Sequence, residues 1–228
     1  KYASNSFLAL KISYINELAN LCDEIGADIN EVTEALGSDG RISPKFLHPG
    51  PGFGGSCFPK DTKALIRIAK KHNLDMHTID AAIKTNNYQK LRMLNKLEIL
   101  LEGNFNKKKI GILGLAFKQE TDDVRESAAI DMISGLIKRG ANIKAYDPVA
   151  NDSMKKLIPN IDYKLSWQSA VEDCDAVVIM TEWNEFRGMD LSTLKKLMFS
   201  PIILDTRNIL NITELKKLDF KFDNVGRK

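Results

Sequence analysis

The sequence has few cysteines and no arrangement of them that would stabilise a small domain. It contains three, an odd number, and no two of them form a C-x-x-C pair. A disulfide framework or a zinc site needs such pairs, so neither is indicated and no metal is expected. Unpaired thiols fit a reducing compartment, and we expect a cytoplasmic protein.

Long apolar runs and blocks of like charge are also missing. No run approaches the roughly 18 apolar residues of a membrane-spanning helix, and no signal peptide is recognisable. The net charge is only +3, with lysine and arginine spread along the chain, so neither a membrane nor a nucleic acid is expected as a partner. The 228 residues, 43% hydrophobic and 28% charged, fit one large or two medium globular domains.

The first half of the chain has helical periodicity. Apolar residues recur at three- and four-residue spacing over 2–22, and similar patterns predict helices over 28–37, 61–71 and 78–101. The last helix is about 35 Å long at 1.5 Å per residue. Helices of that length in a chain of this size usually span two domains or form a dimer seam. We place a domain boundary after this helix, which gives a helical central region over residues 1–105.

The period changes in the second half, where short apolar runs alternate with helical patterns. The expected strands are 109–115, 142–146, 175–181 and 201–205, and the expected helices are 127–140, 152–158, 166–174 and 191–198. This alternation indicates βαβ units, so the predicted fold class is α/β, with a Rossmann-like parallel-sheet domain over residues 106–228. Ligands of such sheets bind beyond the carboxyl ends of the strands.

The ligand edge of this predicted sheet carries a partial glycine motif and two cations. Gly111 and Gly114 are followed by Ala116, so the G-x-G-x-x-G pattern is incomplete and gives weak evidence for a dinucleotide. Most charges in the loops after the strands are expected to be solvated. Lys118 and Arg207 are exceptions, because both directly follow strands, where cations suit a phosphate-bearing ligand.

A glycine- and proline-rich loop in the first half presents a thiol. Residues 48–61 read HPGPGFGGSCFPKD, which places Cys57 close to Lys60 and Asp61. Glycines let backbone approach a ligand, and a thiolate is a strong nucleophile near positive charge or a helix N-terminus. A buried structural cysteine remains the alternative. Cys22, on an apolar helix stripe, is expected in the core.

Further polar and aromatic residues flank this loop. Phe46, Phe53 and Phe58 can enclose a ligand or pin the loop to the core, and the sequence leaves both possibilities open. Lys1 and Asn5 share a helix face, and the pattern alone indicates a solvated helix start.

Several motifs, in order along the whole chain, carry a resemblance to a known family. They are KYASNSFLALKIS, GFGGSCFPKD, GILGLAFK, DDVRES, AYDP, MTEW and LDTRN. The sequence resembles the nucleotide-sugar 6-dehydrogenases of the UDP-glucose/GDP-mannose dehydrogenase family. The CFPKD form is similar to the branch acting on UDP-glucose; the branches acting on GDP-mannose or UDP-N-acetyl sugars are alternatives.

The resemblance implies three parts: an N-terminal Rossmann domain that binds NAD, a central helical dimerisation region, and a C-terminal UDP-binding domain. The chain begins at Lys1, so we expect the NAD domain to lie outside it and the chain alone to be inactive. The implied activity is the NAD-dependent two-step oxidation of UDP-glucose to UDP-glucuronate, which commonly feeds polysaccharide synthesis. The implied partners are UDP-glucose and a second copy, bound through the central helices as a homodimer.

The resemblance also implies roles for individual residues. Cys57 matches the nucleophile, which holds the sugar first as a thiohemiacetal and then as a thioester. Lys1 and Asn5 match a pair that stabilises negative charge on the sugar C6 oxygen, and Asp61 matches a carboxylate that handles water or protons. Arg125 matches a contact to NAD. The implied substrate-binding residues are Arg41, which would reach the partner subunit's site, Phe46, Gly54, Phe58, Phe117, Lys118 and Arg207.

Two other functions are alternatives. One is a nucleotide-sugar-binding dimer module without catalysis, which applies if the protein has no NAD domain. The other is a cysteine hydrolase, which needs a base for its thiol; His72 and His77 follow the loop but lack triad-like spacing.

Overall fold

The computed structural model describes residues 1–227, which form two compact units. The first contains Lys1–Lys90 together with the C-terminal residues from Val225, and the second contains Leu91–Asn224. The sequence placed the domain boundary after residue 105, and that boundary stays a prediction. The division between the compact units falls earlier, because the last turns of the long helix pack within the second unit.

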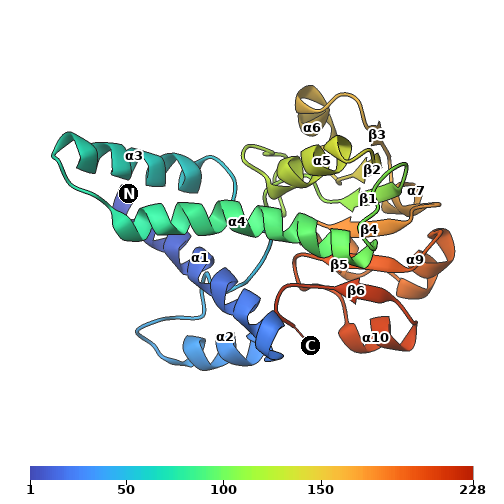
Figure 1. Cartoon of the computed structure of the whole chain (residues 1–228), viewed down its shortest axis with the longest axis horizontal. Coiled ribbons are helices and arrows are strands. Elements are labelled where there is room, and N and C mark those ends of the chain that lie inside the picture. The colour runs from blue at the N-terminus through green and yellow to red at the C-terminus, as the bar shows by residue number, and fades with distance from the viewer. Residues whose placement is uncertain (228) are drawn as a thin grey trace. The chain divides into compact units, whose positions relative to one another are not determined.

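The first unit is helical, as its periodicity predicts. Its helices are α1 (Tyr2–Ile25), α2 (Ile29–Ser38), α3 (Cys57–Lys71) and the first part of α4 (His77–Leu100) (Figure 1). Gly26 ends α1 with φ 73°, a left-handed conformation that suits glycine. Asp28 begins α2 by accepting a hydrogen bond from the amide of Asn30.

Contacts far apart in the sequence hold this unit together. Helix α1 packs along α3, and the hydroxyl of Ser13 on α1 donates to the carbonyl of Ala82 on α4 over 2.8 Å. The C-terminal segment joins them, because the amide of Ile29 donates to the carbonyl of Gly226 over 2.7 Å. Cys22 is buried in this core, as predicted.

The second unit is built on a parallel sheet, which confirms the predicted α/β class. The strand order is β3-β2-β1-β4-β5-β6, and every neighbouring pair is parallel. The strands are β1 (Lys109–Leu113), β2 (Asn142–Tyr146), β3 (Asp162–Tyr163), β4 (Ala176–Ile179), β5 (Ile202–Asp205) and β6 (Lys221–Asp223). The chain reverses its winding between β1 and β4, so the loops after these two strands meet at the ligand edge.

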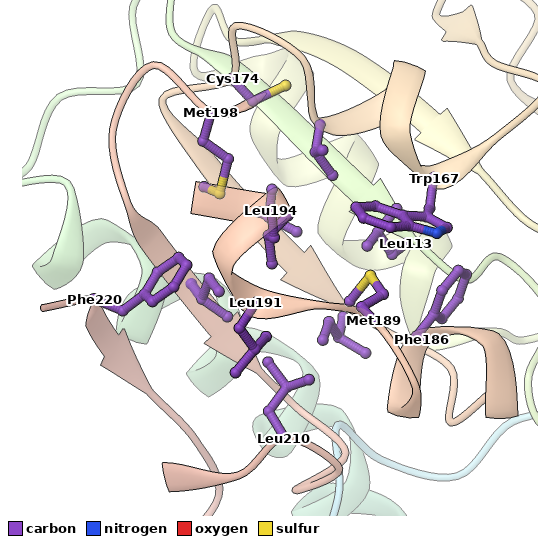
Figure 2. Packing of buried hydrophobic residues seen from close by; sticks show 14 of the residues in the cluster. Leu113, Trp167, Cys174, Phe186, Met189, Leu191, Leu194, Met198, Leu210 and Phe220 are labelled. Atoms are coloured by element: carbon purple, nitrogen blue, oxygen red, sulfur yellow. The ribbon is translucent and has the colours of Figure 1, made fainter. Parts of the chain in front are cut away.

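Short helices connect the strands of the sheet (Figure 1). They are α5 (Ala128–Lys138), α6 (Asn151–Leu157), α7 (Trp167–Val171), α8 (Asn184–Arg187), α9 (Leu191–Leu197) and α10 (Ile212–Lys217). Figure 2 shows Trp167, Phe186 and Met189 packed near Leu113 of β1, within a buried cluster that also includes Leu194. Burial on both faces explains why β4 reads as a continuous apolar run.

Candidate functional site

The thiol of Cys57 lies at the start of a helix, at the end of the glycine-rich loop. Cys57 is the first residue of α3 and is exposed, whereas Cys22 and Cys174 are buried. Burial raises the pKa of the Cys174 thiol to about 11 and also raises the pKa of Cys22. A buried structural role therefore fits those two cysteines and not Cys57.

Asp61 lies one helical turn after Cys57, with its side chain fully buried. The Nδ2 of Asn5, on α1, donates to the Asp61 Oδ2 over 2.6 Å. The Oδ1 atom has no hydrogen-bond partner, and the Lys60 ammonium lies 3.8 Å from it. An incompletely satisfied buried carboxylate is uncommon and marks a site that can accept a further donor.

Lys1 precedes Asn5 by one turn of the same helix. The amide of Asn5 donates to the carbonyl of Lys1 over 3.0 Å, and Lys1 is exposed. The structure thus joins α1 and α3 through the Asn5–Asp61 hydrogen bond, with Lys1 and Cys57 each one turn from that bond. The resulting group contains an ammonium, an amide donor, a carboxylate and an exposed thiol.

The three aromatic residues of the loop region form a stack with a buried end and an exposed end. The Phe58 ring centroid lies 5.9 Å from that of Phe53 and 6.1 Å from that of Phe46. Phe53 is buried, while Phe46 is 38% exposed and has φ 65°, which is unusual for an aromatic residue. Phe53 therefore anchors the loop to the core, Phe46 presents a ring to solvent, and enclosure of a ligand by these rings stays a prediction.

Arg41 and Arg125 each form an ion pair with an aspartate two residues earlier in the chain. The Arg41 guanidinium lies 2.6 Å from Asp39, which lowers the pKa of that carboxyl and raises the pKa of Arg41. Arg125 pairs in the same way with Asp123 and lowers its pKa. Both guanidinium groups are exposed, and an exposed ion pair contributes little to stability.

The cations at the carboxyl edge of the sheet lie beside the loop after β1. Arg207 donates from Nη2 to the carbonyl of Phe117 over 3.0 Å and from Nε to that of Met180 over 2.8 Å. Its guanidinium also lies 3.2 Å from the carboxylate of Glu182. The ammonium of Lys118 is exposed and lies 5.7 Å from the Phe117 ring centroid. Arg207 therefore contacts the backbone of Phe117, and Lys118 lies near the ring of the same residue; their role in binding a ligand stays a prediction.

Asp147, at the end of β2, holds this edge together, a role that the sequence analysis missed. Its carboxylate accepts from the amides of Leu115 and Ala116, over 2.7 and 3.1 Å, and from the Trp183 indole over 3.1 Å. It also accepts from the amides of Val149 and Ala150. The expectation that such loop charges are solvated is wrong for Asp147, which is buried because five donors replace water around it.

The crevice that would receive a dinucleotide in a Rossmann sheet is filled by protein here. A Cβ on Gly114 would lie 2.4 Å from that of Thr181, whose hydroxyl donates to the carbonyl of Ala116. The acidic residue that normally binds the ribose corresponds to Asp147, whose oxygens are already occupied. This edge therefore does not fit NAD bound in the standard way.

Two further properties of residues 1–227 concern metal-ligating side chains and helices suited to crossing a membrane. Among residues 1–227, no cluster of histidine, cysteine, aspartate and glutamate could hold a metal ion. None of the helices formed by these residues is long and apolar enough to cross a membrane.

Comparisons with known proteins agree with the division into two parts. The central-domain model of the UDP-glucose/GDP-mannose dehydrogenase family matches residues 1–88, and the UDP-binding-domain model of that family matches residues 111–212. The chain is 43% identical over 227 residues to a UDP-glucose 6-dehydrogenase of Rhizobium meliloti, covering all of this chain and 52% of that protein. It is 45% identical over 233 residues to the corresponding Rickettsia conorii protein, covering 53% of it.

A solved structure has the same fold. The UDP-glucose dehydrogenase of Pyrobaculum islandicum superimposes with a TM-score of 0.89 at 35% identity, covering 100% of this chain and 50% of that one. The chain thus spans about half the length of the relatives that it matches. It belongs to the UDP-glucose/GDP-mannose dehydrogenase family, of which it contains the central and the UDP-binding domains.

Proposed function

We propose that the complete protein oxidises UDP-glucose to UDP-glucuronate with NAD, and that this chain supplies the thiol and the UDP-binding edge. The observation that carries the proposal is the exposed Cys57 at the first turn of α3, one turn from the buried Asp61 and its hydrogen bond from the half-buried Asn5. A nucleophile, a donor for developing charge and a carboxylate base are the groups that aldehyde capture and thioester hydrolysis need. NAD is the proposed oxidant, bound by another part of the complete protein.

In the capture step, the Cys57 thiolate adds to the C6 aldehyde of the oxidised sugar. A carbon–sulfur bond forms, and the carbonyl electron pair moves onto the oxygen. Lys1 and Asn5 are the proposed donors to that oxygen, because an ammonium and an amide stabilise an oxyanion better than water does when they are already oriented. The product is a thiohemiacetal, one oxidation short of a thioester.

In the release step, water attacks the thioester carbon and the carbon–sulfur bond breaks. The thiolate of Cys57 leaves, and the sugar carboxylate forms. We assign one proton of the attacking water to Asp61, whose Oδ1 has no hydrogen-bond donor, and the other returns to the leaving thiolate of Cys57. Its hydrogen bond from Asn5 fixes the carboxylate orientation without using that oxygen.

The remaining contacts are assigned to substrate binding. Lys118 and Arg207 provide positive charge for the diphosphate, and Arg207 is held in place by the backbone carbonyls that it contacts. Phe46, Gly54 and Phe58 are the proposed enclosure of the sugar. Two arginines have weaker support, because each is paired with a neighbouring aspartate: Arg41, proposed to reach the partner subunit's site, and Arg125, proposed to contact NAD.

A substrate panel on the complete protein tests the proposal. We expect NAD reduction with UDP-glucose, and at least about tenfold lower kcat/KM with UDP-N-acetyl sugars and GDP-mannose, a discrimination of about 1.4 kcal/mol. Calorimetric binding of UDP-glucose without any turnover would instead identify the non-catalytic module. Faster turnover with GDP-mannose would move the substrate to the other branch of the family.

A homodimer through the central helices is part of the proposal. Helix α1 exposes large apolar side chains on one face, with Phe7 61%, Tyr14 51% and Leu21 52% exposed. These residues are seven apart, so they form a stripe along the helix of the kind that buries against a partner.

We expect Phe7→Asp with Leu21→Asp to convert the dimer to a monomer, with a Kd raised at least about a hundredfold, because two charges would be desolvated at the seam. Light scattering after gel filtration measures the mass. Ile99→Asp is the matched control, because Ile99 is 74% exposed but lies in the second unit. A dimer that survives the double substitution would show that this stripe is not the seam.

A further inference from the structure

The glycine-rich loop before Cys57 is buried although it has no regular secondary structure. Residues 50–55 are all buried and belong to neither a helix nor a strand. A buried backbone without a ladder must find partners for its N–H and C=O groups elsewhere, because an unpaired group costs about as much as a lost hydrogen bond. The partners of this segment therefore determine its shape.

Those partners are the side-chain amides of two helices. The Oδ1 of Asn86 accepts from the amide of Phe53 over 2.7 Å, while its Nδ2 donates to the carbonyl of the same residue over 3.0 Å. Both backbone polar groups of Gly50 are also paired. Its N–H donates to the Oδ1 of Asn16 on α1 over 2.8 Å, and its carbonyl accepts from the Nε2 of Gln89 on α4 over 2.9 Å. Asn20 fixes Gln89 in turn by donating to its Oε1 over 2.9 Å.

These amides occupy positions that helix packing alone would give to apolar residues. Asn16 and Gln89 are 0% exposed and Asn86 is 5% exposed. Asn86 and Gln89 follow the buried Ala82 on α4 at three- and four-residue spacing, which is the spacing of a core stripe. A buried amide is costly unless its donor and acceptor are both used. Asn86 uses both on one residue of the loop, whereas Asn16 uses its Oδ1 and leaves its Nδ2 without a hydrogen-bond partner.

The backbone of the loop lies directly against these amides. Gly52 has φ 107°, and a Cβ there would lie 3.0 Å from the Oδ1 of Asn86 and 3.2 Å from the Cγ of Lys90. Only a residue without a side chain allows that approach. The close contact between this backbone and the side chain of Asn86 therefore depends on glycine at position 52.

We propose that Asn86, supported by Asn16 and Gln89, is a positioning residue that fixes the backbone of residues 50–53 and so sets where Cys57 begins α3. The loop reaches Cys57 only four residues after Phe53, so a displacement at Phe53 is passed to the first turn of the helix. The consequence for turnover rests on the proposed function; the consequence for the loop does not.

Replacing Asn86 with aspartate makes this role dependent on pH. A protonated carboxyl can accept from the amide of Phe53 and donate to its carbonyl, as the amide does, whereas a carboxylate can only accept and so repels that carbonyl. Burial favours the neutral form and raises the pKa of the new carboxyl above its ordinary range. The variant therefore keeps the contact at low pH and loses it as the pH rises through that raised pKa.

Other charged groups near Asn86 are the same in every variant. Lys90 lies one turn further along α4 and favours the ionised carboxyl, Glu17 on α1 accepts from Thr85, and His48 begins the loop. Asn87→Asp is the matched control, because it adds the same charge to an exposed neighbour on the same helix. His48 and Glu17 are present in the control and in the wild type alike.

The test measures amide hydrogen exchange of residues 50–55 in the complete protein and its turnover with UDP-glucose, between about pH 5 and pH 8. We expect exchange of this segment in Asn86→Asp to match the wild type at the low end and to be about tenfold faster at the high end, with kcat relative to wild type falling in parallel. Asn87→Asp should match the wild type throughout. Identical behaviour of the two variants at every pH, or faster exchange with unchanged kcat, would overturn the positioning role.

A second variant covers the case in which Asn86→Asp does not fold. Gln89→Glu keeps Asn86 and removes the donor to the carbonyl of Gly50 only when the new carboxyl ionises, so the same pH pattern is expected. A flat exchange profile in Gln89→Glu would then overturn the proposal. A wild type that oxidises no nucleotide sugar while the exchange pattern holds would count against the proposed function alone.

Discussion

Cys57→Ser is expected to lower the formation of UDP-glucuronate by the complete protein at least about a thousandfold, as the loss of a covalent nucleophile does in other enzymes. A thiol is partly ionised near neutral pH and a hydroxyl is not, so serine adds poorly to the intermediate aldehyde. The ester that it would form is also a poorer acyl donor than a thioester. Product is measured chromatographically, so that a release of free aldehyde is seen separately.

The control for this variant is Cys22→Ala. Cys22 is buried in the first unit, and its replacement removes a thiol without touching the loop. We expect full turnover from this control at temperatures where it stays folded. Iodoacetamide gives an independent measure, because Cys57 is the exposed thiol among the three and its alkylation should track inactivation one for one. A Cys57→Ser protein that still makes UDP-glucuronate at near wild-type rate would remove covalent capture from the mechanism.

Local pattern was sufficient to predict the larger elements of this chain. The apolar run of β4 follows from burial on both faces of the strand. The three- and four-residue spacing in α1 follows from burial on one face of the helix. β3, β6, α8 and α10 were missed, because elements of two to six residues span too few periods for a pattern to stand out. Helix α3 begins at Cys57, earlier than the predicted start at residue 61. Pro59 is compatible with this start, because the first turn of a helix does not use the N–H that proline lacks.

The site was only partly predictable from sequence, for a different reason. Cys57 and Asp61 stand four apart in one helix, so their proximity is local, but the hydrogen bond from Asn5 to Asp61 joins residues 56 positions apart. The burial of Asp147 and Asn86 depends on donors and acceptors from other elements. One signal was available: polar residues at core positions of a helix, as in the Ala82, Asn86, Gln89 series, indicate backbone that needs partners.

Asp61→Asn is expected to slow turnover about a hundredfold or more while KM for UDP-glucose changes by less than about threefold. An asparagine carbonyl can still accept the hydrogen bond from Asn5, so the packing of α1 on α3 is retained. The amide cannot take a proton from water, so hydrolysis of the thioester becomes the slow step. The variant should therefore accumulate a sugar adduct on Cys57, which intact-protein mass spectrometry detects after mixing with UDP-glucose and NAD.

The stability of this variant separates a functional carboxylate from a structural one. Asp61 is fully buried with one oxygen unpaired by hydrogen bonds, an arrangement that costs folding free energy. Neutralising it should leave the melting temperature unchanged or raise it, whereas a structural ion pair with Lys60 would make the variant less stable. Asp75→Asn, at an exposed turn, is the matched control for charge removal. Unchanged kcat without an adduct would exclude Asp61 as the base, and a lower melting temperature with slow turnover would reassign it to holding α1 against α3.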